Sequence, residues 1–265
     1  MWIARTGIVS SSGGVLYDTD AQAFITASGI TDTTQKTAIN QLVTDLKGYG
    51  IWAKMKAIYP FVGGTATTHK FNLKDPRDLD VAYRLLFVGG GTHSATGYLP
   101  NGTDSYANTN FISSSILSVN STHISYYSRT NTNIGVDISS RYITGDAGIT
   151  YIYIRDTGTS YSRVNAVGPD TVNSNSDGKG MYISNRLISQ RFDFFKNTTK
   201  TTINTPSSGL PIREIDIASI NFNGSRSFGN KECAFASIGD GLTDTEATNL
   251  YTAVNAYQVT LSRNI

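Results

Sequence analysis

The chain has 265 residues, a formal net charge of +2 and one cysteine. This length can bury a full hydrophobic core in one domain. So small a net charge, spread along the chain, excludes an electrostatic partnership with nucleic acid, and a single cysteine excludes an internal disulfide. No stretch approaches the roughly 20 apolar residues of a membrane span, and the N-terminus has no apolar run of signal-peptide length. We therefore expect neither membrane insertion nor a signal peptide.

The start of the chain predicts a short arm in front of one domain. The first fifteen residues end in "SSSGG", which is typical of a flexible joint. Charged residues make up only 16% of the chain, which suits a β protein with many polar turns. We expect an N-terminal arm over residues 1–15 and a single domain over residues 16–265.

Helical periodicity dominates the next forty residues. Two helices are predicted over residues 18–29 and 32–48, and Asp32 followed by Gln35 has the pattern of a capping box. One further helical turn is expected to change into a strand. The helical segment is therefore predicted to cover residues 18–57.

From about residue 80 the apolar period changes to two, the period of a β-strand. Runs such as "DVAYRLLFV", "HISYYSR", "ITYIYIRD" and "EIDIASINF" are separated by Gly, Asn, Asp and Ser turns. Many short strands at this spacing indicate an antiparallel sandwich. The predicted fold class is mostly β, an antiparallel two-sheet jelly-roll sandwich with N-terminal helices and a C-terminal helix.

The C-terminal helix is predicted over residues 243–261. Asp240, Asp244 and Glu246 look like a metal loop, but Thr243 and Glu246 stand three apart, as a capping box requires. Apolar residues then recur at helical spacing. We expect the acids to start a helix whose apolar face lies on the body of the protein.

The chain resembles the concanavalin A-like (laminin G-like, lectin and glucanase) jelly-roll proteins found in bacteriophage virion and tail-fibre genes. The resemblance rests on "DAQAFITASGITDTTQKTAINQLVTDLKGYGIWAKMKAIYPFVGG", on "FASIGDGLTDTEATNLYTAVNAYQVTLSRN" and on the strands between them. It implies a place on the virion surface, contact with other virion proteins and attachment to cell-surface glycan. That superfamily includes both lectins and glucanases, so the fold alone does not decide between binding and cleavage.

The stretch "REIDIASIN", residues 213–221, bears on that choice. Laminarinase-type glucanases carry Glu-x-Asp and then a second Glu, because a retaining glycosidase needs two carboxyl groups at one glycosidic bond. Glu214 and Asp216 fit the first half, but Ala218 and Ser219 stand where the second carboxyl belongs. We expect a non-enzymatic glycan-binding adhesin. The alternatives are a structural or decoration protein of the particle without a ligand and, least favoured, a glycan hydrolase with another carboxylate pair.

The strongest candidate for a glycan site is the strand "ITYIYIRD". Tyr151, Tyr153 and Arg155 share one face of this strand, while Ile152 and Ile154 share the other. If the isoleucines face the core, two rings and a guanidinium line an outer or concave face, as a glycan site requires. The alternative is that the tyrosines pack inside the sandwich.

A weaker form of the same pattern marks Tyr127 and Arg129 in "HISYYSR". Single glycan sites are usually shallow, so useful attachment gains from several copies. We therefore expect a homo-oligomer, for example a trimer.

Possible metal ligands occur in "NSNSDGKG", residues 173–180. Asn173, Asn175 and Asp177 stand at alternate positions, the order of oxygen ligands that begins a calcium loop. The closing Glu is missing, since Ser184 stands there, and Asp-Gly between strands is also a hairpin signal. Calcium is thus a candidate cofactor, with a hairpin turn as the favoured alternative.

Another acidic run, "KDPRDLD", contains Asp75, Asp78 and Asp80 among basic residues. A hard-cation site and a salt-bridged loop are both compatible with it, and the loop is favoured. No metal-ligand spacing links the three histidines, which are His69, His93 and His123.

Overall fold

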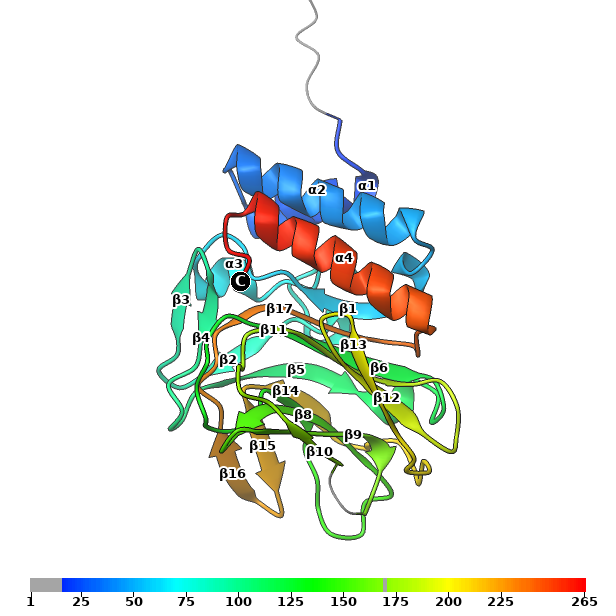
Figure 1. The fold of residues 1–265 in the computed structure, drawn as a ribbon. Coiled ribbons are helices and arrows are strands. Elements are labelled where there is room, and N and C mark those ends of the chain that lie inside the picture. Colours follow the sequence, from blue (N-terminus) through cyan, green and yellow to red (C-terminus); the bar gives the residue numbers. More distant parts are fainter. Residues whose placement is uncertain (1–15, 169–170) are drawn as a thin grey trace, which may run out of the picture.

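The computed structural model describes residues 16–168 and 171–265, so the predicted arm over residues 1–15 lies outside the described residues. Two antiparallel sheets pack face to face, and a layer of helices covers the outer side of one of them (Figure 1). A two-stranded hairpin lies at the end of the molecule opposite the helices. The predicted mostly-β sandwich with N-terminal and C-terminal helices is confirmed.

The eight-stranded sheet lies under the helices. Its central strands β11, β6 and β17 pair along nearly their whole length. In spatial order its strands are β13 (Thr199–Ile203), β12 (Phe192–Lys196), β11 (Gly180–Arg186), β6 (Thr122–Ser128), β17 (Cys233–Gly239), β4 (Gly97–Leu99) and β3 (Thr92–Ser94), with β1 (Met55–Tyr59) also paired to β17.

The seven-stranded sheet forms the other half of the sandwich. In spatial order its strands are β10 (Thr171–Ser174), β9 (Thr159–Ala166), β8 (Ile149–Asp156), β7 (Ile138–Ser140), β14 (Glu214–Ile217), β5 (Tyr106–Ile112) and β2 (Leu86–Val88). The separate hairpin consists of β15 (Ser219–Phe222) and β16 (Ser225–Phe228).

The predicted strand "EIDIASINF" is in fact two strands of different sheets. Ala218 has φ +66°, a left-handed conformation that ends the regular pleat. The chain before it is β14 and the chain after it is β15. This bend turns the hairpin away from the seven-stranded sheet.

The N-terminal helices begin where the capping signals predict. Helix α1 (Thr19–Ser28) follows the N-cap Asp18, and α2 (Thr33–Gly48) follows Asp32, whose side chain accepts a hydrogen bond from the backbone N–H of Gln35. The Gln35 side chain does not return this bond, because its Oε1 accepts from the Gly63 N–H at 2.9 Å. The predicted capping box is therefore half formed.

The helical segment is shorter than the predicted 18–57. After the short 3₁₀ helix η1 (Trp52–Lys54), strand β1 begins at Met55, because its backbone pairs with β17. The remaining short helices are α3 (Ala66–His69), η2 (Asp80–Ala82) and η3 (Ser113–Ser115). None of the helices in the described ranges is long and apolar enough to span a membrane.

The C-terminal helix α4 (Asp244–Thr260) has the predicted capping box, in which Thr243 and Glu246 satisfy each other's backbone N–H groups. Glu246 also forms an ion pair with Lys54, 2.6 Å between Oε2 and Nζ. The acids near the start of this helix therefore act as caps and ion-pair partners. They fix α4 to the segment that leads into β1.

Two large apolar clusters fill the spaces between the layers. The sandwich core lies between the two sheets and includes Ile124, Tyr126, Ile152, Ile154 and Phe192. The helix-side core lies between the helices and the eight-stranded sheet and includes Leu42, Leu46, Tyr127, Phe235 and Val254. Burial of this much apolar surface is the main stabilising term of the fold.

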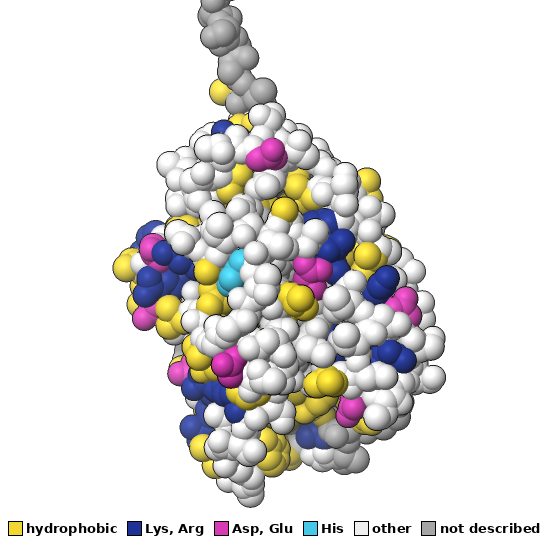
Figure 2. Space-filling view, turned by 90° about the vertical axis from the view of Figure 1, so that its left-hand side faces the viewer, with side chains coloured by type: hydrophobic (Ala, Val, Ile, Leu, Met, Phe, Trp, Pro, Cys, Tyr) yellow, Lys and Arg dark blue, Asp and Glu magenta, His cyan; other side chains and the backbone are white. Residues whose placement is uncertain are grey.

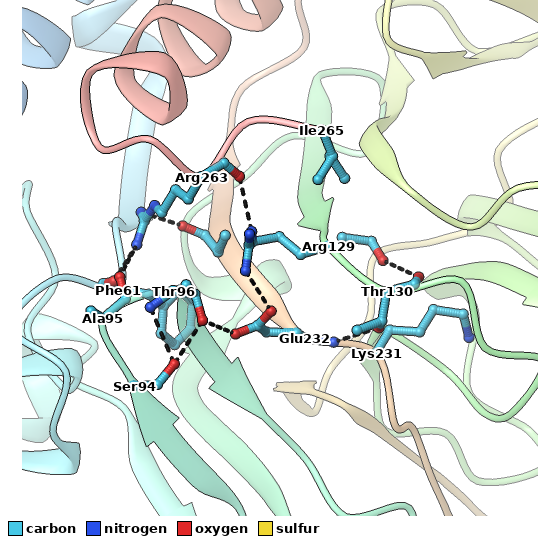
Figure 3. A network of polar contacts seen from close by, with 12 residues as sticks. Phe61, Ser94, Ala95, Thr96, Arg129, Thr130, Lys231, Glu232, Arg263 and Ile265 are labelled. Carbon is cyan, nitrogen blue, oxygen red and sulfur yellow. Dashed lines mark hydrogen bonds and ion pairs between the residues drawn. The ribbon is translucent and has the colours of Figure 1, made fainter.

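Arg263, just after α4, attaches the end of the chain to the body (Figure 3). Its side chain is 1% exposed and donates hydrogen bonds to the carbonyl oxygens of Pro60, Phe61 and Ala234 at 2.8 to 2.9 Å. It also donates to the side chain of Gln258 at 2.5 Å. Since a guanidinium is costly to bury without partners, these acceptors make the position specific for arginine.

Charged side chains do not gather into one surface on the side of the molecule that Figure 2 shows. Uncharged polar side chains and backbone cover most of that side, and Lys and Arg are interspersed with Asp and Glu. Hydrophobic side chains occur there in small groups. This distribution agrees with the small net charge of the chain.

Candidate functional site

The outer face of the seven-stranded sheet carries an aromatic cluster of its own. Ile152 and Ile154 of β8 lie in the sandwich core, so Tyr151 and Tyr153, which alternate with them, point to the opposite face. This outer cluster consists of Val136, Ile149, Tyr151 and Ile220, with Tyr142, Tyr153 and Tyr161 packed against it. The described helices lie on the other sheet, so none of them covers this face (Figure 1).

A hollow of about 510 Å³ opens over the outer cluster. We call it the tyrosine hollow. Its lining consists of Ile149, Tyr151, Tyr153, Asp156, Tyr161, Arg163, Gly168, Ile220 and Phe222. Strands β8 and β9 form its floor, and β15 of the hairpin forms one wall. Its size lies in the range of small-ligand sites in proteins.

Edge-to-face contacts hold the rings of the hollow. The Tyr153 ring lies 5.3 Å from Tyr151 and 6.1 Å from Tyr161, measured between centroids, with interplanar angles of 85° and 77°. Phe222 stacks on Tyr142 at 4.9 Å and is 47% exposed. Such contacts fix ring orientation. Tyr151 is only 4% exposed, so it supports the other rings more than it offers surface.

Two charged side chains lie beside these rings. The Arg163 guanidinium lies 5.4 Å from the centroid of Tyr151 and donates to the carbonyl oxygen of Gly168. Asp156, at the end of β8, adds a carboxylate to the lining. The hollow thus combines aromatic faces with a donor and an acceptor of hydrogen bonds.

The predicted site residue Arg155 does not line the hollow. Its guanidinium donates to the Asn175 carbonyl oxygen at 3.0 Å and to the Asn131 side chain at 2.9 Å. The pairing of β8 with β9 shifts register between Tyr153 and Asp156, which breaks the alternation from which the prediction was made. Arg163 of the neighbouring strand supplies the guanidinium instead.

The prediction of a glycan contact at Tyr127 is wrong. Its ring is 1% exposed within the helix-side core, and its hydroxyl accepts a hydrogen bond from the Ile265 N–H at 3.2 Å. Arg129 forms an ion pair with Glu232 at 2.9 Å and donates to the Arg263 carbonyl oxygen (Figure 3). Strand β6 belongs to the sheet that the helices cover, so its aromatic face is part of the core.

The predicted calcium ligands Asn173, Asn175 and Asp177 lie in and after β10, where a lysine approaches two of them. The Lys196 ammonium donates to the Asn175 side-chain oxygen at 2.7 Å and to the Asp177 carbonyl oxygen. The Asn175 amide nitrogen donates to Tyr182 Oη at 3.0 Å. A lysine thus already donates to one of the predicted ligand oxygens, that of Asn175, and the Asp177 carboxylate accepts a hydrogen bond from the Lys179 N–H at 3.1 Å.

The run "KDPRDLD" is a salt-bridged loop, as favoured. Asp75 pairs with Arg77, and Asp78 and Asp80 both pair with Arg84. Among the residues that the structure describes, no group of three or more His, Cys, Asp or Glu side chains is placed to hold a metal ion.

Two histidines meet in space without any signal in the sequence. The Nδ1 atoms of His69 and His93 lie 2.9 Å apart, and the rings pack against Phe61, Phe87 and Tyr98. Burial lowers the pKa of His69 to about 3 and also lowers that of His93. Both rings are therefore neutral at pH 7, and one donates to the other.

Glu214 and Asp216, which match the first half of the glucanase motif, are held in ion pairs. Asp216 is 0% exposed, and its carboxylate lies 2.6 Å from Arg226 and 3.1 Å from Arg141. Glu214 pairs with Arg141 at 3.4 Å. A carboxylate so enclosed cannot contact a glycosidic bond, so Asp216 organises β14 and the hairpin.

No family model and no curated protein matches the chain. Among solved structures, it is similar to a Trypanosoma rangeli sialidase mutant displaying trans-sialidase activity, at 7% identity and TM-score 0.52, covering 84% of this chain and 39% of that one. It also matches domain 4 of a GH43 extracellular arabinanase from Geobacillus stearothermophilus in complex with arabinotriose, at 11% identity and TM-score 0.49 over 74% and 98% of the two chains.

A third match is the CBM40 of a Ruminococcus gnavus sialidase bound to α2,3-sialyllactose, at 14% identity and TM-score 0.37, over 48% of this chain and 80% of that one. Identities this low are informative about architecture only. Together with the sheet topology, the sialidase match shows that the chain has a two-sheet β-sandwich fold.

Proposed function

We propose that the protein is a non-enzymatic glycan-binding protein and that the tyrosine hollow is its sugar site. The observation that carries the proposal is the hollow itself, in which ordered aromatic rings, a carboxylate and a guanidinium meet on the sheet face that none of the described helices covers. The fold is shared with part of a sialidase, a protein that acts on glycans.

The chemistry of the hollow suits a sugar. A pyranose ring has an apolar face of C–H groups and an edge of hydroxyls. The half-buried ring of Tyr153 and the exposed ring of Phe222 offer surfaces for the apolar face, while Asp156 and Arg163 accept and donate hydrogen bonds at the edge. Each buried ring contact is worth about 1 kcal/mol, so one site binds weakly on its own.

Binding without cleavage is supported by the carboxylates. The general acid of a glycosidase must reach the glycosidic oxygen, and its partner stands about 5 to 9.5 Å away. Asp216 is enclosed by two arginines, and the hollow is lined by one carboxylate among the described residues, Asp156. We therefore assign Asp156 to binding.

We infer a role in attachment on a virion surface from the resemblance of the whole chain to phage jelly-roll proteins. Weak single sites gain affinity when several copies engage one surface. A homo-oligomer, such as a trimer held by other virion proteins, would present several tyrosine hollows to cell-surface glycan. Light scattering that shows only a monomer, together with no multimer on a particle, would count against this arrangement.

A glycan array with wild type and matched variants tests the binding role. We expect wild type to bind a defined group of glycans, and Tyr153→Ala or Phe222→Ala to lower that signal by about tenfold, which corresponds to about 1.4 kcal/mol. The control is Tyr49→Ala, which removes an exposed ring at the end of α2, far from the hollow in the fold. Folded wild type that binds no glycan would overturn the proposal.

A further inference from the structure

A second hollow adjoins the first. It has a volume of about 600 Å³ and is lined by Gly102, Asn133, Ile134, Gly135, Tyr153, Asp156, Arg226, Ser227 and Phe228. Tyr153 and Asp156 line both hollows. The two hollows therefore meet at a shared ring and a shared carboxylate, and we call them together the groove.

The β15–β16 hairpin is the wall that both halves share. β15 contributes Phe222 to the tyrosine hollow, and β16 contributes Ser227 and Phe228 to the second hollow. The hairpin is held at its base by the Gly229 N–H, which donates to the Ala218 carbonyl oxygen at 2.8 Å, and near its tip by the stacking of Phe222 on Tyr142. The wall thus has contacts at both ends, which favours a preformed groove.

The charge along the groove does not favour an anionic ligand. Its described lining carries one carboxylate, Asp156, and two guanidiniums, Arg163 and Arg226. Arg226 is already paired with buried Asp216 at 2.6 Å and lies over the Tyr106 ring at 3.9 Å. The described groove and this paired carboxylate together carry no excess positive charge to hold a polymer of acidic sugars.

We propose that this groove binds an internal segment of a neutral polysaccharide chain. Sugars on either side of Tyr153 occupy the two hollows, and Asp156 accepts hydrogen bonds from hydroxyls at the middle of the segment. Each hollow alone has the size of a small-ligand site, so the pair suits several consecutive sugars better than one terminal sugar. This inference rests on the proposed function, because it names the ligand class of the same site.

Binding of oligosaccharides of increasing length tests the groove. The probes are malto-, cello- and arabino-oligosaccharides of two to six sugars, with 3′-sialyllactose as the anionic probe, titrated by calorimetry. For at least one neutral series we expect affinity to rise at least tenfold from the dimer to the hexamer. 3′-Sialyllactose should bind no better than a neutral trimer.

A variant that fills only the second hollow separates the two halves. Ser227→Trp adds a large side chain at an exposed position of β16, and Ser115→Trp is the same change at an exposed serine of η3 outside the groove. Ser227→Trp should remove most of the gain with length and leave the dimer affinity within twofold of wild type. Ser115→Trp should change neither, and circular dichroism checks that both variants are folded.

The outcomes distinguish binding of a polysaccharide along the groove from glycan binding in the tyrosine hollow. If short glycans bind and added sugars give no gain in affinity, or if Ser227→Trp leaves that gain intact, the proposal of binding along the groove is contradicted. The proposal of a sugar site in the tyrosine hollow would still stand. Stronger binding of 3′-sialyllactose than of every neutral probe would overturn the neutral ligand class. If no probe of any length binds folded wild type, the groove and the proposed function both fail.

Discussion

The outward faces of the two sheets carry similar residues but differ in what lies over them. Tyr127 on the eight-stranded sheet and Tyr153 on the seven-stranded sheet both come from strands that contain two tyrosines. The first is buried under α2 and α4, whereas the second lines a hollow. Whether an aromatic strand face is buried core or accessible surface thus depends on the layer above it, which is a property of the tertiary fold.

The covered face also depends on polar anchors. Arg263 and the capping box of α4 fix the C-terminal helix over the sheet. On the open face, the β15–β16 hairpin contributes Ile220 to the aromatic cluster, and Tyr142 packs against it. We therefore expect substitutions on the covered face to act on stability and those on the open face to act on binding.

Arg263→Met should have the largest effect. It removes the hydrogen bonds of a buried guanidinium to three carbonyl oxygens, and a hydrogen bond to a charged group is worth about 1.5 to 3 kcal/mol. Tyr257 and Gln258 still donate to the carbonyl oxygens of Pro60 and Ala234. We expect a loss of at least about 3 kcal/mol in the free energy of unfolding, measured by urea denaturation. Arg77→Met, at an arginine whose side chain is 61% exposed, is the control and should change it by under about 0.5 kcal/mol.

Tyr127→Ala and Tyr153→Ala compare the two faces directly. Loss of the buried Tyr127 ring should lower the free energy of unfolding by about 3 kcal/mol or more. Loss of the partly exposed Tyr153 ring should lower it by about 1 kcal/mol. Urea denaturation measures both. Equal losses would mean that the two faces are buried alike, which would contradict the comparison.

Lowering the pH should destabilise the protein through His123. Burial lowers its folded-state pKa to about 4, against an ordinary value of 6.5. As pH falls below 6.5 the unfolded chain takes up this proton and the folded chain does not, so stability is lost until about pH 4. From pH 7.5 to pH 5, wild type should lose about 2 kcal/mol more than His123→Gln.

Comparison with His123→Gln is needed because buried Asp137 has the opposite effect on how stability changes with pH. Burial raises its folded-state pKa to about 6, so this residue favours the folded state as pH falls below 6. Both proteins keep Asp137, and its effect cancels in the difference. Identical pH dependence in wild type and variant would contradict a buried neutral His123.

Calcium should have the smallest effect. Lys196 already donates to the oxygens of Asn175 and Asp177, so we expect neither calcium nor a chelator to shift the melting temperature by more than about 1 °C. Differential scanning fluorimetry measures this. A rise of several degrees with calcium would mean that the ion displaces the lysine.

Local signals in the sequence predicted the elements well. The caps at Asp32 and Thr243 and the change of period near residue 80 are short-range features, and the structure contains the helices and the β sandwich that they predict. The break at Ala218 was missed, because a left-handed alanine has no sequence signal and follows from the turn into β15.

The site was predicted only in part, because its members come together through tertiary contacts. The alternation in β8 predicted two tyrosines on one face, and the structure adds Tyr161, Arg163 and Phe222 from other strands. Because the register of β8 and β9 shifts between Tyr153 and Asp156, Arg163 lines the hollow in place of the predicted Arg155. Lys196, which donates to the predicted calcium loop, lies 19 residues beyond Asp177 in β12, outside any local motif.

Hydrogen–deuterium exchange with the best-binding oligosaccharide of the array at saturation tests the central claim most directly. We predict slower exchange in β8, β9 and the β15–β16 hairpin, and unchanged exchange in α1, α2 and α4. Protection confined to the helical layer, or to the edge strands β3 and β13, would place the ligand elsewhere and contradict the account.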